Sequence, residues 1–141
     1  MHISSKCSIA VHCLIFIYEY GTENKVTSEL LSMSTGCNPV TIRNIISALK
    51  KDGIIEVKHG TGGTKLAAPL NEISLYRICA AVDPRAIRNM IGIHPAPSPF
   101  CPVGKNIEAV LDKTYDALRA DLTASMKSVT LDKILEDYHS I

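Results

Sequence analysis

The chain has no tryptophan, two phenylalanines and five tyrosines, so its apolar fraction of 46% is largely aliphatic. No apolar stretch approaches the roughly eighteen residues of a membrane-spanning helix, so no such helix is expected. Neither sign of charge dominates, because fifteen Lys and Arg stand against fourteen Asp and Glu, a formal net charge of +1. At 141 residues, we expect one domain, or a small domain with an appendage.

Paired cysteine spacing is also missing. The five cysteines are odd in number, which suits a reducing cytoplasm better than a disulfide scaffold. Residues 9–18 are apolar and follow Lys6, as in a secretion signal. They include His12, run into Glu19 and precede no small-x-small cleavage site, so we reject a signal peptide. The expected localisation is cytoplasmic.

Residues 26–34 are predicted to form the first helix of a helix-turn-helix. Thr27 or Ser28 can cap it, and Leu30, Leu31 and Met33 supply its apolar side. An earlier helix, beginning at residues 4–5, is expected to pack behind the second helix of this motif. Its apolar residues at helical spacing are Ile9, Ala10, Cys13, Leu14, Ile17 and Tyr18.

The second helix of the motif has clear signals at both ends. Gly36 can take the positive φ of a sharp corner, Asn38 is a natural N-cap, and Pro39 suits the first helical position. The helix is expected to run to about Lys51, with Gly53 as its left-handed stop. Its buried stripe is Ile42, Ile45, Ile46 and Leu49.

Strands at residues 54–58 and 64–68 are predicted next, around a glycine-rich tip at 59–63. A helix-turn-helix with such a wing is typical of proteins that read duplex DNA, because the second helix fits the major groove. Residues 38–65 carry five Lys and Arg against two acids, which favours phosphate binding. The alternative is a helical corner of an unrelated domain with a solvated charged face. The candidate DNA-binding residues, with Arg43 leading, are Thr27, Ser28, Asn38, Val40, Thr41, Arg43, Asn44, His59, Thr61, Thr64 and Lys65.

This stretch resembles the Rrf-two family of bacterial winged-helix regulators. The resemblance is carried by Ser28-Glu29-Leu30, Pro39-Val40-Thr41-Ile42-Arg43-Asn44-Ile45, the run from Leu49 to Ile55, Gly60-Thr61-Gly62-Gly63 and Leu66-Ala67. The family includes an iron–sulfur cluster regulator, a nitric-oxide-sensing repressor and a cysteine-metabolism repressor. It also places a helix at residues 73–82, where Ser74 is the expected N-cap and Cys79 is expected to be buried.

A long helix is predicted after a proline-rich loop. The segment 94–104 holds four prolines within eight residues, so it should be extended. Asn106 is the expected N-cap of a helix of about 23 residues, followed by a short helix capped by Thr130. A chain this short cannot cover the long stripe on both sides, so we expect a homodimer, with packing on its own domain as the alternative. The predicted interface is Ile107, Val110, Leu111, Thr114, Leu118, Leu122 and Met126.

The cluster-binding members of the family have three closely spaced cysteines before the long helix. Here that loop holds Cys101 alone, so no iron–sulfur cluster is expected. Zinc at Cys79, His94 and Cys101 is possible by ligand type, but the tight paired spacing is missing. The loop resembles the YwnA-like subgroup without the cluster cysteines. Cys101, near a helix start and Lys105, is a candidate redox sensor, or simply a packed thiol. His94, in the same proline-rich loop, is the second sensor candidate.

These patterns predict a mainly α fold with a small β-hairpin wing: a winged helix-turn-helix domain with linker helix (1–82), a Pro-rich loop (83–104), and a dimerisation helix with a C-terminal helix (105–141). The predicted function is a homodimeric, sequence-specific DNA-binding regulator, a repressor that responds to an oxidant or a small molecule. Alternatives are a thiol enzyme using Cys101, which lacks a placed general base, and a winged-helix module that binds protein. The expected partner is double-stranded DNA, with no membrane and no cofactor.

Overall fold

The computed structural model describes residues 5–60 and 62–141. The elements follow in the order α1 (Lys6–Tyr20), α2 (Ser28–Thr35), α3 (Pro39–Lys51), β1 (Ile55–Lys58), β2 (Gly63–Leu66), the 3₁₀ turn η1 (Leu70–Glu72), α4 (Leu75–Val82), α5 (Ala86–Met90), α6 (Pro102–Ser128) and α7 (Leu131–His139). β1 and β2 pair antiparallel, with Ile55 opposite Leu66 and Lys58 opposite Gly63. The predicted mainly α winged helix-turn-helix fold is confirmed.

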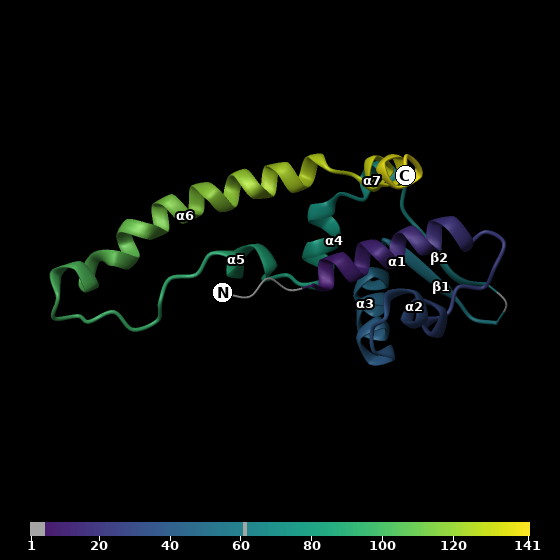
Figure 1. Cartoon of the computed structure of the whole chain (residues 1–141), viewed down its shortest axis with the longest axis horizontal. Helices are drawn as coiled ribbons and strands as arrows, with labels where there is room; N and C mark the ends of the chain where they lie inside the picture. The colour runs from purple at the N-terminus through teal and green to yellow at the C-terminus, as the bar shows by residue number, and fades with distance from the viewer. Residues whose placement is uncertain (1–4, 61) are drawn as a thin grey trace.

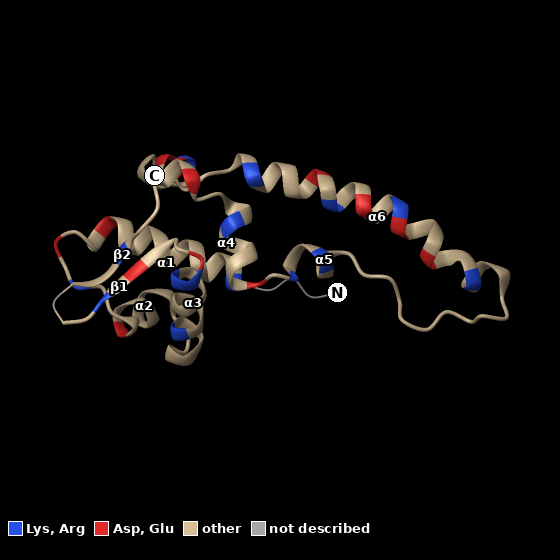
Figure 2. Cartoon of the chain, turned by 180° about the vertical axis from the view of Figure 1, so that it is seen from behind, with Lys and Arg blue, Asp and Glu red and all other residues tan. Residues whose placement is uncertain are grey.

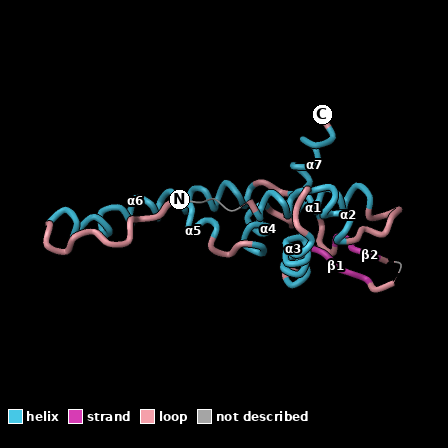
Figure 3. Tube along the Cα trace, turned by 60° about the horizontal axis from the view of Figure 1, so that its bottom comes forward, coloured by secondary structure: helices cyan, strands magenta, loops and turns pink. Residues whose placement is uncertain are grey.

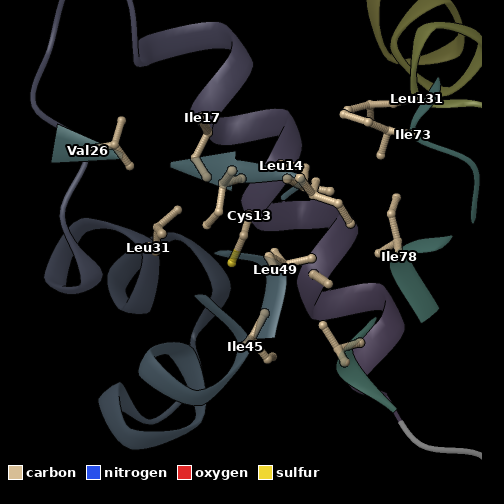
Figure 4. Close-up of a cluster of buried hydrophobic side chains, with 14 of the residues drawn as sticks. Cys13, Leu14, Ile17, Val26, Leu31, Ile45, Leu49, Ile73, Ile78 and Leu131 are labelled. Atoms are coloured by element: carbon tan, nitrogen blue, oxygen red, sulfur yellow. The ribbon is translucent and has the colours of Figure 1, made fainter. Parts of the chain in front are cut away.

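The buried core lies in the head, where α1 runs through the middle of the packing (Figure 4). Ala10, Cys13, Leu14 and Ile17 form the buried face of α1, as predicted. Leu31, Ile42 and Leu49 meet this face from α2 and α3, and each has no exposed surface. The predicted apolar side of α2 was wrong in two positions, because Leu30 and Met33 lie on the outside of the short helix and only Leu31 is buried. Tyr18 is likewise exposed.

α6 extends from one side of the head as a long arm (Figure 1). Its 27 residues span about 40 Å at 1.5 Å per residue. α5 and the loop of residues 91–101 lead outward from the head, and α6 returns alongside them (Figure 1). None of the α6 residues is buried within the chain. No helix in the described ranges is long and apolar enough to cross a membrane.

Backbone hydrogen bonds fix the C-terminal end of this arm to the head. The Leu75 N–H donates to the Val129 carbonyl at 2.7 Å, and the Leu131 N–H donates to the Ile73 carbonyl at 2.8 Å. Between these two bonds, Ser74 and Thr130 form an isolated antiparallel bridge. α4 and the end of α6 are therefore joined as two strands of a sheet are joined, without a flexible linker.

The start of α6 differs from the prediction. The helix begins at Pro102 with Cys101 as N-cap, and Asn106 lies inside it, where its side chain donates to the Pro102 carbonyl at 2.7 Å. The physical reason is that proline is favourable at the first helical position, although it breaks a helix interior. A Cβ on Gly104 would lie 2.5 Å from the Ser98 carbonyl oxygen, so glycine lets the loop pack against the first turn. The expected loop of residues 83–104 also contains the short helix α5.

Candidate nucleic-acid interface

α3 presents the candidate base-reading residues on its outer side. Ile42, Ile45 and Leu49 are buried and fix the rotation of the helix, so Val40, Arg43 and Asn44 point away from the core and are exposed. Thr41 is half-buried. The described residues offer no hydrogen bond or ion pair to the side chains of Arg43 and Asn44, which leaves their donors available to a ligand outside the chain.

The turn between α2 and α3 is held by short local hydrogen bonds. Gly36 has φ +71°, and the Asn38 side chain accepts from the Val40 N–H at 2.7 Å, both as predicted. The Thr35 hydroxyl donates to the Leu31 carbonyl at 2.7 Å and accepts from the Cys37 N–H at 3.2 Å. These bonds fix the angle at which the N-terminus of α3 leaves the head. At the start of α2, Thr27 is the N-cap and accepts from the Leu30 N–H at 3.3 Å, while Ser28 is half-buried.

The β-hairpin projects beside α3 (Figure 3). The end of the hairpin next to its tip is attached to the head by the Thr64 N–H, which donates to the Val26 carbonyl at 3.2 Å. A Cβ on Gly63 would lie 2.9 Å from the Val26 nitrogen, so only glycine permits this approach. Thr64 is 5% exposed, so its side chain is buried and its prediction as a DNA contact is wrong. Thr61 lies outside the described residues.

Lys and Arg residues lie on the hairpin and on α3 (Figure 2). Lys25, Lys58 and His59 line a hollow between the hairpin and α2, and its other lining residues include Thr27, Glu29 of α2 and Ile46 of α3. Lys58 and Lys65 share the outer face of the hairpin with Glu56, which lies 3.8 Å from the Lys58 ammonium. Lys25 was missed by the sequence analysis because it stands in a polar connection. Its position two residues before the N-cap of α2 was the available signal.

A second group that the sequence analysis missed lies at the other end of α3. The Arg77 guanidinium of α4 donates to the Asp52 carboxylate at 2.8 Å and to the Asp52 carbonyl at 2.9 Å. A third nitrogen donates to the Glu72 carbonyl at 3.3 Å. Asp52 is the C-cap of α3, so Arg77 ties the end of the reading helix to α4.

The structure separates the predicted sensor residues from the other thiols. Cys101 is exposed, and hydrogen bonds from the backbone N–H groups of Gly104 and Val103 lower the pKa of its thiol. His94 is also exposed, and no hydrogen bond joins it to Cys101 in the described part of the chain. Cys79 is buried as predicted, and its hydrogen bond to Cys7 raises the pKa of the Cys79 thiol. Burial raises the pKa of Cys13 to about 12.

These donors do not fit an iron–sulfur cluster or a zinc ion. Cys79 is engaged with Cys7 inside the head, while Cys101 is exposed at the start of α6. In residues 5–60 and 62–141, no three His, Cys, Asp or Glu side chains gather as a metal site. A cluster needs a set of thiolates at one point, and this arrangement does not provide it.

The predicted dimer stripe lies along α6, beside the face that packs on α4 and α5. Val110, Thr114 and Leu118 are exposed, whereas Ile107, Leu111, Leu122 and Met126 are half-buried. Charged residues of both signs occupy the rest of the helix (Figure 2). Every one of these seven side chains therefore keeps some surface that no described residue of the same chain covers.

Comparison with known proteins agrees with this geometry. The sequence profile of Rrf2, described as an iron-dependent transcriptional regulator, matches residues 3–137. YwnA of Bacillus subtilis (strain 168), described as an HTH-type transcriptional regulator, is 32% identical over 133 residues, which are 94% of this chain and 96% of YwnA.

Solved structures show the same fold. A transcriptional regulator from Lactobacillus plantarum has a TM-score of 0.78 at 27% identity, covering 96% of this chain and 90% of its own. IscR of T. potens has a TM-score of 0.70 at 17% identity, covering 98% and 88%, and this likeness shows the fold alone. α3 has an exposed outer face with the wing beside it, and the family profile matches residues 3–137. This chain is therefore a DNA-binding transcriptional regulator that belongs to the Rrf2 (Rrf-two) family.

Proposed function

We propose that this protein is a homodimeric repressor that binds a two-fold symmetric operator. The observation that carries the proposal is the pairing of an exposed reading face on α3 with an arm that has no buried residue. Val110 is 62% exposed and Leu118 is 47% exposed, although both belong to the apolar stripe. The same stripe on a second copy would cover them across a two-fold axis.

The arm then determines the distance between the two reading helices. A dimer that contacts successive major grooves on one side of DNA needs about 34 Å between half-sites. α6, about 40 Å long, is of that size. Because its C-terminal end is bonded to α4, and α4 is tied to α3 through Arg77, each reading helix is coupled to the arm through a series of direct contacts.

Within this complex, Arg43 contacts base edges, with Val40, Thr41 and Asn44 beside it. Lys25, Lys58 and Lys65 neutralise phosphates on either side of the wing, and the N-cap Asn38 lies at the entry of α3 into the groove. The protein works without a metal or cluster, and the signal acts where the loop of residues 91–101 meets α6. Cys101 is the candidate for oxidant sensing there, because its exposed thiol has a lowered pKa.

The test is a DNase footprint on the region upstream of the protein's own gene, with affinities for the protected site measured by fluorescence anisotropy. We expect two protected half-sites about one helical turn apart. Arg43→Ala should cost about 1–3 kcal/mol at the operator and relax one base position, while Lys51→Ala, at the far end of the same helix, serves as control. Unchanged discrimination in Arg43→Ala would show that the register of α3 is wrong.

The same protein preparation is used to test the oligomeric state and the metal content. Sedimentation equilibrium should give twice the chain mass, and elemental analysis after anaerobic purification should find no stoichiometric iron or zinc. In a transcription assay, the bound protein should lower the yield of the downstream transcript. A monomer that binds the operator with full affinity would contradict the proposal.

A further inference from the structure

A small cavity lies at the junction of α4, α5 and α6. Its volume is about 240 Å³, close to that of eight water molecules at about 30 Å³ each. It is smaller than the roughly 300–1,000 Å³ of pockets for drug-sized ligands. Tyr76 and Cys79 contribute from α4, Ile87 and Arg88 from α5, and Arg119 and Thr123 from α6. Its occupant would therefore have about as many non-hydrogen atoms as an amino acid.

Two guanidinium groups on the cavity wall have donors to spare. Arg119 donates to the Asp116 carboxylate at 2.9 Å and to the Ile91 carbonyl at 2.8 Å, but its Nε–H is buried and has no acceptor among the described residues. A buried donor left unpaired is unfavourable, and an added acceptor restores what it lacks. Arg88 makes no hydrogen bond or ion pair with any described residue. The pair therefore suits a carboxylate, which accepts from guanidinium groups with good geometry.

One acid lines the same cavity. Asp83, between α4 and α5, makes no side-chain hydrogen bond or ion pair with the described residues. A purely anionic ligand would be repelled by this carboxylate, whereas a ligand that also carries an ammonium group would be attracted by it. The remaining wall includes the aromatic Tyr76, the apolar Ala80 and Ile87, and the hydroxyl-bearing Thr123.

We propose that this cavity is a binding site for a small α-amino acid, whose carboxylate lies between Arg88 and Arg119 and whose ammonium group faces Asp83. Because the walls come from the linker helix, α5 and the arm, the bound molecule fixes these three elements against one another. Its binding then changes operator affinity. That regulatory part rests on the proposed function, whereas the binding itself does not.

Calorimetric titration of the full-length protein without DNA tests the site. The probes are the twenty L-amino acids and, for each that binds, the carboxylic acid that lacks the amino group, as propionate does for alanine. We expect at least one amino acid to bind, and its deaminated partner to bind at least tenfold more weakly. Arg88→Met and Asp83→Asn should each reduce affinity at least tenfold, while Arg85→Met, an exposed arginine outside the cavity, should leave it unchanged.

Arg88 and Asp83 are chosen over Arg119 because neither makes a side-chain bond that the fold needs. Circular dichroism checks that the variants fold. No binding by any of the twenty, equal binding of the deaminated acid, or unchanged affinity in Arg88→Met would each overturn the proposal. Amino-acid binding that leaves operator affinity unchanged would refute the regulatory part. If the wild-type protein bound no operator even without the amino acid, the proposed function would be refuted, while the amino-acid site would stand.

Discussion

Replacing Arg77 with methionine should loosen α3 from α4 while preserving most of the apolar side-chain length. The guanidinium makes one bond to the Asp52 carboxylate and two to backbone carbonyls, those of Asp52 and Glu72. Hydrogen bonds from charged groups contribute about 1.5–3 kcal/mol each when well buried. The Arg77 and Asp52 side chains are 31% and 40% exposed, so solvent screening reduces that figure.

We therefore expect Arg77→Met to lower the free energy of unfolding by about 1–2 kcal/mol, part of it from the lost cation at the C-terminus of α3. Arg77→Lys should recover only a fraction, because an ammonium group cannot make the forked contact with the carboxylate and carbonyl of one residue. Operator affinity should fall several-fold without any change in base preference, since the reading face of α3 keeps its residues.

The measurement is urea unfolding at one fixed protein concentration, because a dimer's stability depends on concentration, together with anisotropy titrations on operator DNA. Asp52→Asn and the double variant complete a thermodynamic cycle. We expect a coupling free energy of about 0.5–1 kcal/mol between the two side chains. Additive effects would refute the inferred ion-pair link, and altered base preference would show that Arg77 acts on the reading face itself.

Three other outcomes follow from the described contacts. Lys65→Ala should weaken binding to all DNA sequences alike and lower the salt slope by about one unit, so a sequence-selective loss in salt titrations would contradict its assignment to phosphate. Leu118→Glu should raise the dimer dissociation constant, measured by sedimentation, about a hundredfold, because one buried leucine is lost from each of the two chains. Ala120→Glu, which lies off the apolar stripe, should leave that constant unchanged, and equal effects of the two variants would place the interface elsewhere. Because backbone N–H groups lower the pKa of Cys101, its alkylation by iodoacetamide should become fast at a lower pH than that of a free thiol. The Cys101→Ser variant should also lose any effect of hydroperoxide on operator affinity. A pH profile like that of a free thiol, or a hydroperoxide effect retained in Cys101→Ser, would exclude Cys101 as an oxidant sensor.

Local signals made the reading helix predictable. Asn38, Pro39 and Gly53 start or end the helix through contacts and backbone angles within a few residues of their own positions. The structure places each of them where the prediction put it. The start of α6 was missed because Pro102 both breaks a helix and begins one well, and only the loop packing around Gly104 decides between these roles.

Contacts between distant residues could not be predicted from local patterns. The Thr64 backbone bonds to Val26 in another part of the chain, and Arg77 meets Asp52 twenty-five positions away. The cavity at the junction depends on three helices at once, and no sequence pattern singled out its arginines: Arg88 belonged to the expected loop of residues 83–104 and Arg119 to the long helix.

Two backbone hydrogen bonds, from Leu75 to Val129 and from Leu131 to Ile73, hold the C-terminal end of α6 on the head. They make α6 a lever whose fulcrum lies at that end. A rotation of 5° at the fulcrum moves the far end of a 40 Å helix by about 3.5 Å, close to the rise of one base pair. The far end begins at Pro102, away from the fulcrum. Residues could therefore be added or removed there, changing the reach of the lever and the operator spacing that a dimer accepts, while the fulcrum and the head stay as they are.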